Sequence, residues 1–178
     1  MNKIQEKKLG RLFSILDRNH NHAVDRSDYE AVGKQVAALR GVSEDSPQYA
    51  QMVAYMGTYW EALAQRADKD ANGRVTWTEW VESMESGSAS MQQTRAQMVG
   101  LAAALLDRDG DGQITAADYV KLVESVGYQM ADADEVFSRL DRNGDGKIDT
   151  SELGMLVDEF LFSADPDAPG NWLLGKLS

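Results

Sequence analysis

Short side chains that carry oxygen recur at alternate positions in one segment, with a spacing that could hold a metal ion. Asp141, Asn143 and Asp145 alternate along the sequence, and Glu152 follows them. Hard divalent cations such as Ca²⁺ take about six to eight oxygen ligands from carboxylates, amides and backbone carbonyls. On a tightly curled loop these four side chains and the backbone carbonyl of Lys147 could all reach one ion. The segment therefore predicts reversible binding of a hard cation.

The segment from Asp141 to Glu152 matches the calcium-binding loop of the EF-hand, a helix-loop-helix unit. In that pattern the ligands stand at loop positions 1, 3, 5, 7, 9 and 12, and a glycine makes the sharp turn at position 6. Gly146 occupies the turn position, and Asp149 at position 9 is expected to bind through a water. An ordinary acidic turn would not need Gly146, Ile148 and Glu152 at these offsets together.

Three related loops begin at Asp17, Asp68 and Asp107. The four loop starts are separated by 51, 39 and 34 residues, which predicts an N-terminal pair and a C-terminal pair of loops. In each loop the residue at position 7 is expected to bind through its backbone carbonyl. The predicted ligands are Asp17, Asn19, Asn21, Ala23 and Asp28 in the first loop; Asp68, Asp70, Asn72, Arg74 and Glu79 in the second; Asp107, Asp109, Asp111, Gln113 and Asp118 in the third; and Asp141, Asn143, Asp145, Lys147 and Glu152 in the fourth.

The first and third loops depart from the pattern. His22 stands where the turn glycine is expected, and it must adopt a positive φ that glycine takes freely. Asp28 and Asp118 close these loops, and aspartate is one methylene too short to offer both oxygens as readily as glutamate. We therefore expect weak binding, or no metal, at the first loop, and better tolerance of Mg²⁺ at both loops. A transition-metal or pH-sensing role for His20 and His22 is less favoured than exposed loop positions, because imidazole is not a hard-cation ligand.

Apolar residues at helical spacing predict the helices that must position these loops. The first helix is amphipathic, with basic residues such as Lys7 and Lys8 between its apolar ones. Helices are expected over residues 3–16, 26–39, 47 to the second loop, 77–84, 91–106, 117–126, 132–140 and 150–162.

Two local patterns tie each loop to its neighbours. Position 8 is β-branched in all four loops, as expected for short strands that pair between loops: Val24, Val75, Ile114 and Ile148. Thr76 with Glu79, and Thr115 with Asp118, are predicted capping boxes that begin the following helices.

The expected fold class is all-α, with four helix-loop-helix units arranged as two EF-hand pairs in one compact protein and short β pairing between loops. The predicted divisions are residues 1–86 for the N-terminal pair (loops 17–28 and 68–79), residues 91–163 for the C-terminal pair (loops 107–118 and 141–152), residues 86–90 as a flexible joint, and residues 164–178 as a tail. Trp172, Leu173 and Leu174 are strongly apolar, and such a cluster is expected to pack against another surface and not to stay exposed to water. We expect the tail to pack in the cleft of one lobe, with a loosely ordered end as the alternative.

Composition excludes several classes of function. The formal net charge is −11, from 29 acidic and 18 basic residues, so nucleic acid and anionic membranes are not expected partners. The chain has no cysteine, which excludes disulfides, thiolate zinc sites and cysteine nucleophiles. The charged N-terminal segment lacks the apolar run of a signal peptide, and no stretch is long enough to span a membrane. We expect a cytoplasmic monomer.

The four loops, with the first two far apart and the last two close, resemble those of calerythrin-like bacterial proteins in the sarcoplasmic calcium-binding protein group of the EF-hand superfamily. The Phe160-Leu161-Phe162 helix end and the tail from Trp172 to Gly175 add to the resemblance. It implies a compact all-α protein of two EF-hand pairs with a cytosolic role in calcium buffering or calcium signalling. In some relatives one of the four loops is silent.

These observations favour reversible calcium binding, by a buffer or by a Ca²⁺-responsive signalling protein that binds a target protein or peptide. The chain has eight methionines, and a stripe such as Met52 with Met56 fits a core better than the Met-rich groove of a sensor. A structural adaptor that binds its partner without Ca²⁺ is the alternative, supported by the apolar tail. An enzyme is not expected, because both histidines lie in one loop and the carboxylates are already assigned to metal cages.

Overall fold

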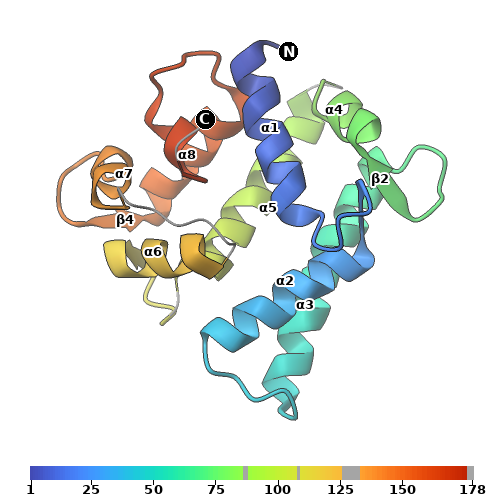
Figure 1. Ribbon diagram of the computed structural model, residues 1–178, viewed down its shortest axis with the longest axis horizontal. Helices are drawn as coiled ribbons and strands as arrows, with labels where there is room; N and C mark the ends of the chain where they lie inside the picture. The colour runs from blue at the N-terminus through green and yellow to red at the C-terminus, as the bar shows by residue number, and fades with distance from the viewer. Residues whose placement is uncertain (86–87, 108, 126–132, 176–178) are drawn as a thin grey trace. The chain divides into compact units, whose positions relative to one another are not determined.

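The computed structural model describes residues 1–85, 88–107, 109–125 and 133–175 (Figure 1). Within these residues the regular secondary structure is helical apart from four three-residue strands, and loops connect the elements. In chain order the elements are α1 Lys3–Leu16, β1 Ala23–Asp25, α2 Arg26–Leu39, α3 Pro47–Ala67, β2 Arg74–Thr76, α4 Trp77–Glu85, α5 Ser88–Leu106, β3 Gln113–Thr115, α6 Ala116–Ser125, α7 Ala133–Leu140, β4 Lys147–Asp149, α8 Thr150–Phe162 and the 3₁₀ helix η1 Pro169–Trp172. The predicted all-α EF-hand fold is confirmed. None of the described helices is both long and apolar enough to cross a membrane.

The strands pair between loops as predicted. β1 pairs antiparallel with β2, and Val24 lies opposite Val75; β3 pairs antiparallel with β4, and Ile114 lies opposite Ile148. All four of these side chains are buried. The β-branched residue of each loop therefore both pairs with the partner loop and packs in the core.

The chain divides into two compact units, Leu12–Thr94 and Met1–Arg11 with Arg95–Ser178. The two boundaries fall inside α1 and inside α5. Residues 1–11 thus belong with the C-terminal half, whereas the sequence assigned them to the N-terminal pair. α5 begins at Ser88, so residues 88–90 of the predicted joint are helical, and residues 86–87 lie outside the described residues. Serine is favoured at helix starts and alanine is a strong helix former, which explains the earlier start.

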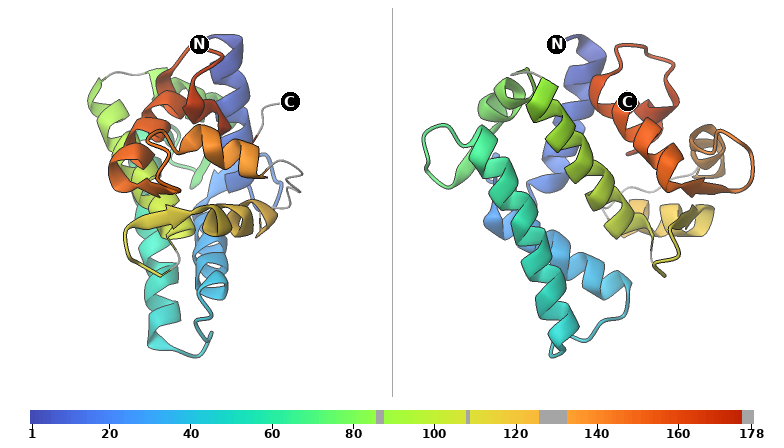
Figure 2. Two further views of the ribbon diagram at one scale, coloured as in Figure 1. Left: turned by 90° about the vertical axis from the view of Figure 1, so that its left-hand side faces the viewer. Right: turned by 180° about the vertical axis from the view of Figure 1, so that it is seen from behind.

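The unit Leu12–Thr94 is built around the packing of α2 on α3, which run alongside each other in the left view of Figure 2. Gly33 allows their close approach, because a Cβ at this position would lie 2.8 Å from the Cα of Val53. Phe13 contacts Trp77 and Trp80 edge-on, with ring centroids 5.5 and 5.7 Å away. These aromatic contacts pack the end of α1, which leads into the first loop, against α4, which follows the second loop.

The unit Met1–Arg11 with Arg95–Ser178 has α8 at its centre. Leu156, Val157 and Phe160 of α8 are fully buried. η1 packs against α7 and α8, and Leu173 just after it is buried as well. Ala168 and Leu173 of the tail are therefore buried among the helices of this unit.

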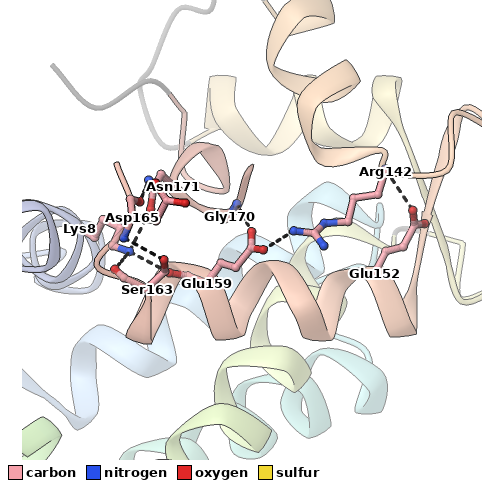
Figure 3. Close-up of polar contacts among 8 residues, drawn as sticks. All are labelled: Lys8, Arg142, Glu152, Glu159, Ser163, Asp165, Gly170 and Asn171. Atoms are coloured by element: carbon pink, nitrogen blue, oxygen red, sulfur yellow. Dashed lines mark hydrogen bonds and ion pairs between the residues drawn. The ribbon is translucent and has the colours of Figure 1, made fainter. Parts of the chain in front are cut away.

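Lys8 is the exception to the amphipathic pattern predicted for α1. Its side chain is fully buried, and its Nζ donates to the carbonyls of Glu159 and Ser163 at 2.8 and 2.9 Å and to Oδ1 of Asn171 at 2.9 Å (Figure 3). Burial lowers the pKa of Lys8 to about 8, and the nearby Glu159 carboxylate opposes that shift. At the C-terminal end of α8, where the last carbonyls lack helical donors, Lys8 donates to the carbonyl of Ser163 and adds a second hydrogen bond to that of Glu159, which already accepts the N–H of Ser163.

Lys8→Met is expected to lower the free energy of unfolding by about 1–3 kcal/mol, because it removes the donor from buried oxygens while keeping the side-chain volume. Urea denaturation followed by circular dichroism measures the change. Lys3→Met, an exposed site on the same helix, is the control and should stay within about 0.5 kcal/mol of the parent. Equal effects of the two substitutions would contradict a structural role for Lys8.

Candidate metal centres

Each loop starts at the end of one helix and finishes in the first turn of the next. Asp68 follows α3 and donates its backbone N–H to the carbonyl of Ala64, while Glu79 lies in the first turn of α4. The other loop starts repeat this hydrogen bond to the residue four positions earlier: Asp17 to Phe13, Asp107 to Ala103 and Asp141 to Phe137. The first and last predicted ligands of each loop are therefore positioned by two different helices.

The second loop gathers three carboxylates. Ligand oxygens of Asp68, Asp70 and Glu79 all lie within 4.8 Å of one another. Two oxygens that each lie about 2.3–2.6 Å from one Ca²⁺ can be no more than about 5 Å apart, so this donor set fits a hard dication. Glu79 Oε2 accepts from the backbone N–H of Thr76 at 2.9 Å, and this hydrogen bond is the main cause that lowers the pKa of Glu79.

The third loop gathers Asp107, Asp109 and Asp111, whose ligand oxygens also lie within 4.8 Å of one another. Asp118 is not part of this group; its Oδ2 accepts from the backbone N–H of Thr115 at 3.1 Å. In the second loop the longer Glu79 does join its group. Glu152 at position 12 of the fourth loop is in no such group among the described residues either, so the shorter reach of an aspartate at position 12 stays a prediction.

The fourth loop has the same scaffold. Asp141 accepts backbone N–H groups from Gly144 and Gly146, each at 2.8 Å. Glu152 is buried, and its Oε1 accepts from the backbone N–H of Arg142 at 3.1 Å. Among the described residues, the groups of three acidic side chains as close as 4.8 Å are those of the second and third loops.

At loop positions 1, 3, 5 and 12 the first loop offers two side-chain carboxylates, whereas each of the other loops offers three or four. Asp17 accepts from the backbone N–H groups of Asn21 and His22, each at 3.0 Å. Asp28 is buried, and its Oδ1 accepts from the backbone N–H of Arg18 at 3.0 Å. Burial is the main cause that raises the pKa of Asp28. The loop has the shape of its relatives with fewer charges to bind a cation.

The turn requires positive φ at two positions of every loop, of which the sequence indicated only position 6. His22 has φ 65°, as predicted for a residue in the place of glycine. Position 4 is the one that sequence reasoning missed, although glycine at this position in the third and fourth loops was a signal. The residues at positions 4 and 6 are His20 and His22, Ala71 and Gly73, Gly110 and Gly112, and Gly144 and Gly146. Backbone strain therefore decreases from the first loop through the second to the last two.

The residues predicted to bind through their backbone carbonyls are the first residues of the four strands. Each donates its backbone N–H to the side-chain oxygen of position 5, which fixes the direction of the backbone at that point. These pairs are Ala23 with Asn21 at 3.0 Å, Arg74 with Asn72 at 2.8 Å, Gln113 with Asp111 at 2.8 Å and Lys147 with Asp145 at 3.0 Å. The four position-7 residues are thus placed equivalently.

Capping boxes follow all four loops. Those of Thr76 with Glu79 and Thr115 with Asp118 are confirmed. Sequence reasoning missed the other two, Asp25 with Asp28 and Asp149 with Glu152, although an acidic residue three positions after an aspartate was a visible signal. The last ligand of each loop is therefore also part of the start of the next helix.

Comparisons with known proteins agree with this geometry. The family model of the EF hand matches residues 104–123 and 133–157. Calerythrin of Saccharopolyspora erythraea is 26% identical over 164 residues, covering 89% of this chain and 93% of calerythrin.

Two solved structures resemble the whole fold. A Streptomyces coelicolor calcium-binding protein has a TM-score of 0.68 and 25% identity, covering 90% of this chain and 99% of its own. A sarcoplasmic calcium-binding protein from amphioxus has a TM-score of 0.81 and 23% identity, covering 99% and 98% of the two chains.

His22→Gly is expected to raise the Ca²⁺ affinity of the first loop about fivefold or more, because a left-handed non-glycine residue costs roughly 1–2 kcal/mol. An NMR titration that follows the residue 22 amide, which donates to Asp17, measures the affinity. His22→Ala is the matched control, because it removes the imidazole and keeps the Cβ. Equal gains in both variants would assign the weakness to the imidazole and not to the backbone.

Proposed function

Because the chain belongs to the calerythrin and sarcoplasmic calcium-binding protein family of EF-hand proteins, we propose that it is a calcium buffer whose C-terminal pair is closed by its own tail. It is an EF-hand calcium-binding protein. The observation that carries the proposal is the gathering of acidic ligand oxygens within 4.8 Å in the second and third loops.

Four loops form the proposed set of sites, with the ligands predicted from the sequence. The loops closed by Glu79 and Glu152 are the proposed tight Ca²⁺ sites, because glutamate can offer both oxygens to a large cation. The loops closed by Asp28 and Asp118 bind more weakly and accept Mg²⁺. Four Ca²⁺ ions would add +8 and change the formal charge from −11 to −3. Relief of repulsion among the carboxylates is the main reason why binding stabilises the fold.

A buffer is favoured over a sensor by the burial of groups that a sensor would expose. Sensor EF-hands open on binding Ca²⁺ to present a Met-rich groove, whereas buffer hands barely open. Met56 is buried in the core of its unit, and Leu173 of the tail is buried against the C-terminal helices. A signalling role is the second candidate, because the similar Streptomyces coelicolor protein is described in connection with prokaryotic calcium-mediated regulation. The monomeric state, the cytoplasmic location and the absence of enzymatic activity stay predictions.

Calorimetric titration of metal-free protein with Ca²⁺ in millimolar Mg²⁺ is expected to resolve two tight sites from weaker ones. Asp141→Ala and Glu79→Ala should each delete one tight site. Arg95→Gln, which alters an exposed ion pair with Asp158, is the control and should leave the stoichiometry unchanged, because neither residue belongs to a loop. Absence of Ca²⁺ uptake by the parent chain at millimolar concentration would overturn the proposed function.

Ca²⁺ is expected to raise the melting temperature by roughly 10 °C or more over a chelator, because ligand at about 1,000 times its Kd stabilises by about 4 kcal/mol per site. A dye that binds exposed apolar surface separates the two roles in the same samples. A buffer should bind no more dye with Ca²⁺ than without it. Dye binding that appears only with Ca²⁺ would favour the sensor.

A further inference from the structure

Arg142 is the one residue of the fourth loop whose side chain reaches out to a carboxylate of α8. It occupies position 2, between the ligands Asp141 and Asn143, and its backbone N–H donates to Glu152. Its guanidinium forms an ion pair with Glu159 (Figure 3). The two side chains are 33% and 26% exposed, so water screens the pair only in part.

The same carboxylate holds the tail. Glu159 uses Oε1 for Arg142 and Oε2 to accept the backbone N–H of Gly170 at 2.8 Å. Gly170 lies directly on α8, because a Cβ at this position would stand 2.9 Å from the backbone nitrogen of Phe160 and would overlap the carbonyl oxygen of Leu156. One glutamate thus connects a residue inside the calcium loop with a residue of the tail.

The tail is docked in one defined place by contacts on both sides of Gly170. Asn171 accepts from Lys8 and donates to the carbonyls of Asp165 and Pro166 at 2.8 and 2.9 Å. Next to it, the backbone carbonyl of Trp172 accepts from the hydroxyl of Tyr119 at 3.0 Å. The Trp172 ring lies 4.5 Å from the guanidinium carbon of Arg139. Because these contacts are directional and adjacent, we expect the tail to form them together or lose them together, which is the two-state behaviour that energetic coupling requires.

We propose that Arg142 and Glu159 are positioning residues for the fourth calcium loop, and that they couple cation binding there to docking of the tail over residues 165–173. The inference rests on the proposed function. A cation orders the loop backbone and with it Arg142, which holds Glu159 in place for Gly170. The docked tail in turn holds Glu159 where it neutralises the arginine next to the bound cation. Linkage of this kind is reciprocal: Ca²⁺ favours docking, and docking raises the affinity for Ca²⁺.

An NMR titration of the full ¹⁵N-labelled chain in calcium-buffered solutions tests the coupling. The Gly146 amide, which donates to Asp141, reports the fourth loop; the Gly73 amide, which donates to Asp68, reports the second; and the Gly170 amide reports the tail. In the parent chain the Gly170 signal should change together with that of Gly146. In Arg142→Gln and in Glu159→Gln the Gly146 midpoint should move to roughly three- to tenfold higher Ca²⁺, with the Gly73 midpoint unchanged.

Two further variants separate coupling from a general loss of stability. Arg95→Gln removes another arginine pair of α8, that with Asp158, which has no contact with the fourth loop or the tail in the described hydrogen bonds. It should leave the Gly146 and Gly170 responses as in the parent. Gly170→Ala should undock the tail and weaken binding at Gly146 by the same factor as Glu159→Gln, and the Arg142→Gln/Glu159→Gln double variant should lose no more than either single one.

The outcomes distinguish this inference from the proposed function. Gly146 midpoints that are equal in the parent, Arg142→Gln and Glu159→Gln would overturn the coupling while leaving calcium binding intact. A Gly170 amide that does not respond to Ca²⁺ in the parent would overturn it as well. A Gly146 amide that never responds to Ca²⁺ would overturn both the inference and the proposed site.

Discussion

Acidic oxygens of like charge lie within 4.8 Å of one another in the second and third loops, and their mutual repulsion must be opposed by other groups. Backbone N–H groups do this. The aspartate at position 1 accepts the N–H of the residue at position 6 in every loop, as Asp141 does from Gly146. A backbone that curls tightly enough to aim its N–H groups inward needs left-handed residues at positions 4 and 6. The glycines of the third and fourth loops follow from this electrostatic requirement.

The same requirement links each cage to two helices. The first ligand continues the hydrogen bonding of the incoming helix, and the last ligand caps the outgoing one, as Asp68 and Glu79 do around the second loop. Between them a buried β-branched residue, such as Val75, pairs with the partner loop. A cation bound at the centre would therefore act on two helix ends and on the neighbouring loop together. Under the proposed function, this arrangement would link the occupancy of paired loops to each other and to the stability of the fold.

The sequence was sufficient for what depends on neighbours along the chain. Loop positions, strand residues such as Ile148, and most helix ends follow from local spacing and capping chemistry, and the structure agrees with them. It was insufficient for Lys8, whose partners stand 151 to 163 residues away, because a burial that depends on distant segments leaves no periodic signal in the helix itself. It also missed the positive φ of Ala71, because alanine gives no compositional sign of a left-handed turn. The start of α5 at Ser88 was missed because serine and glycine together usually mark a joint.

The hydrogen bond between Lys8 and Asn171 also limits how early one part of the chain can fold during translation. The ribosome extends a chain at roughly 5–20 residues per second, so α1 emerges well before the segment that must receive its lysine has been made. Over that interval the ammonium stays hydrated, and the carbonyl end of α8 does not yet exist. Residues 12–94, which form the other compact unit, have all been synthesised before residue 95 is added. The unit that contains Lys8 can reach its final packing only after residue 171 has emerged.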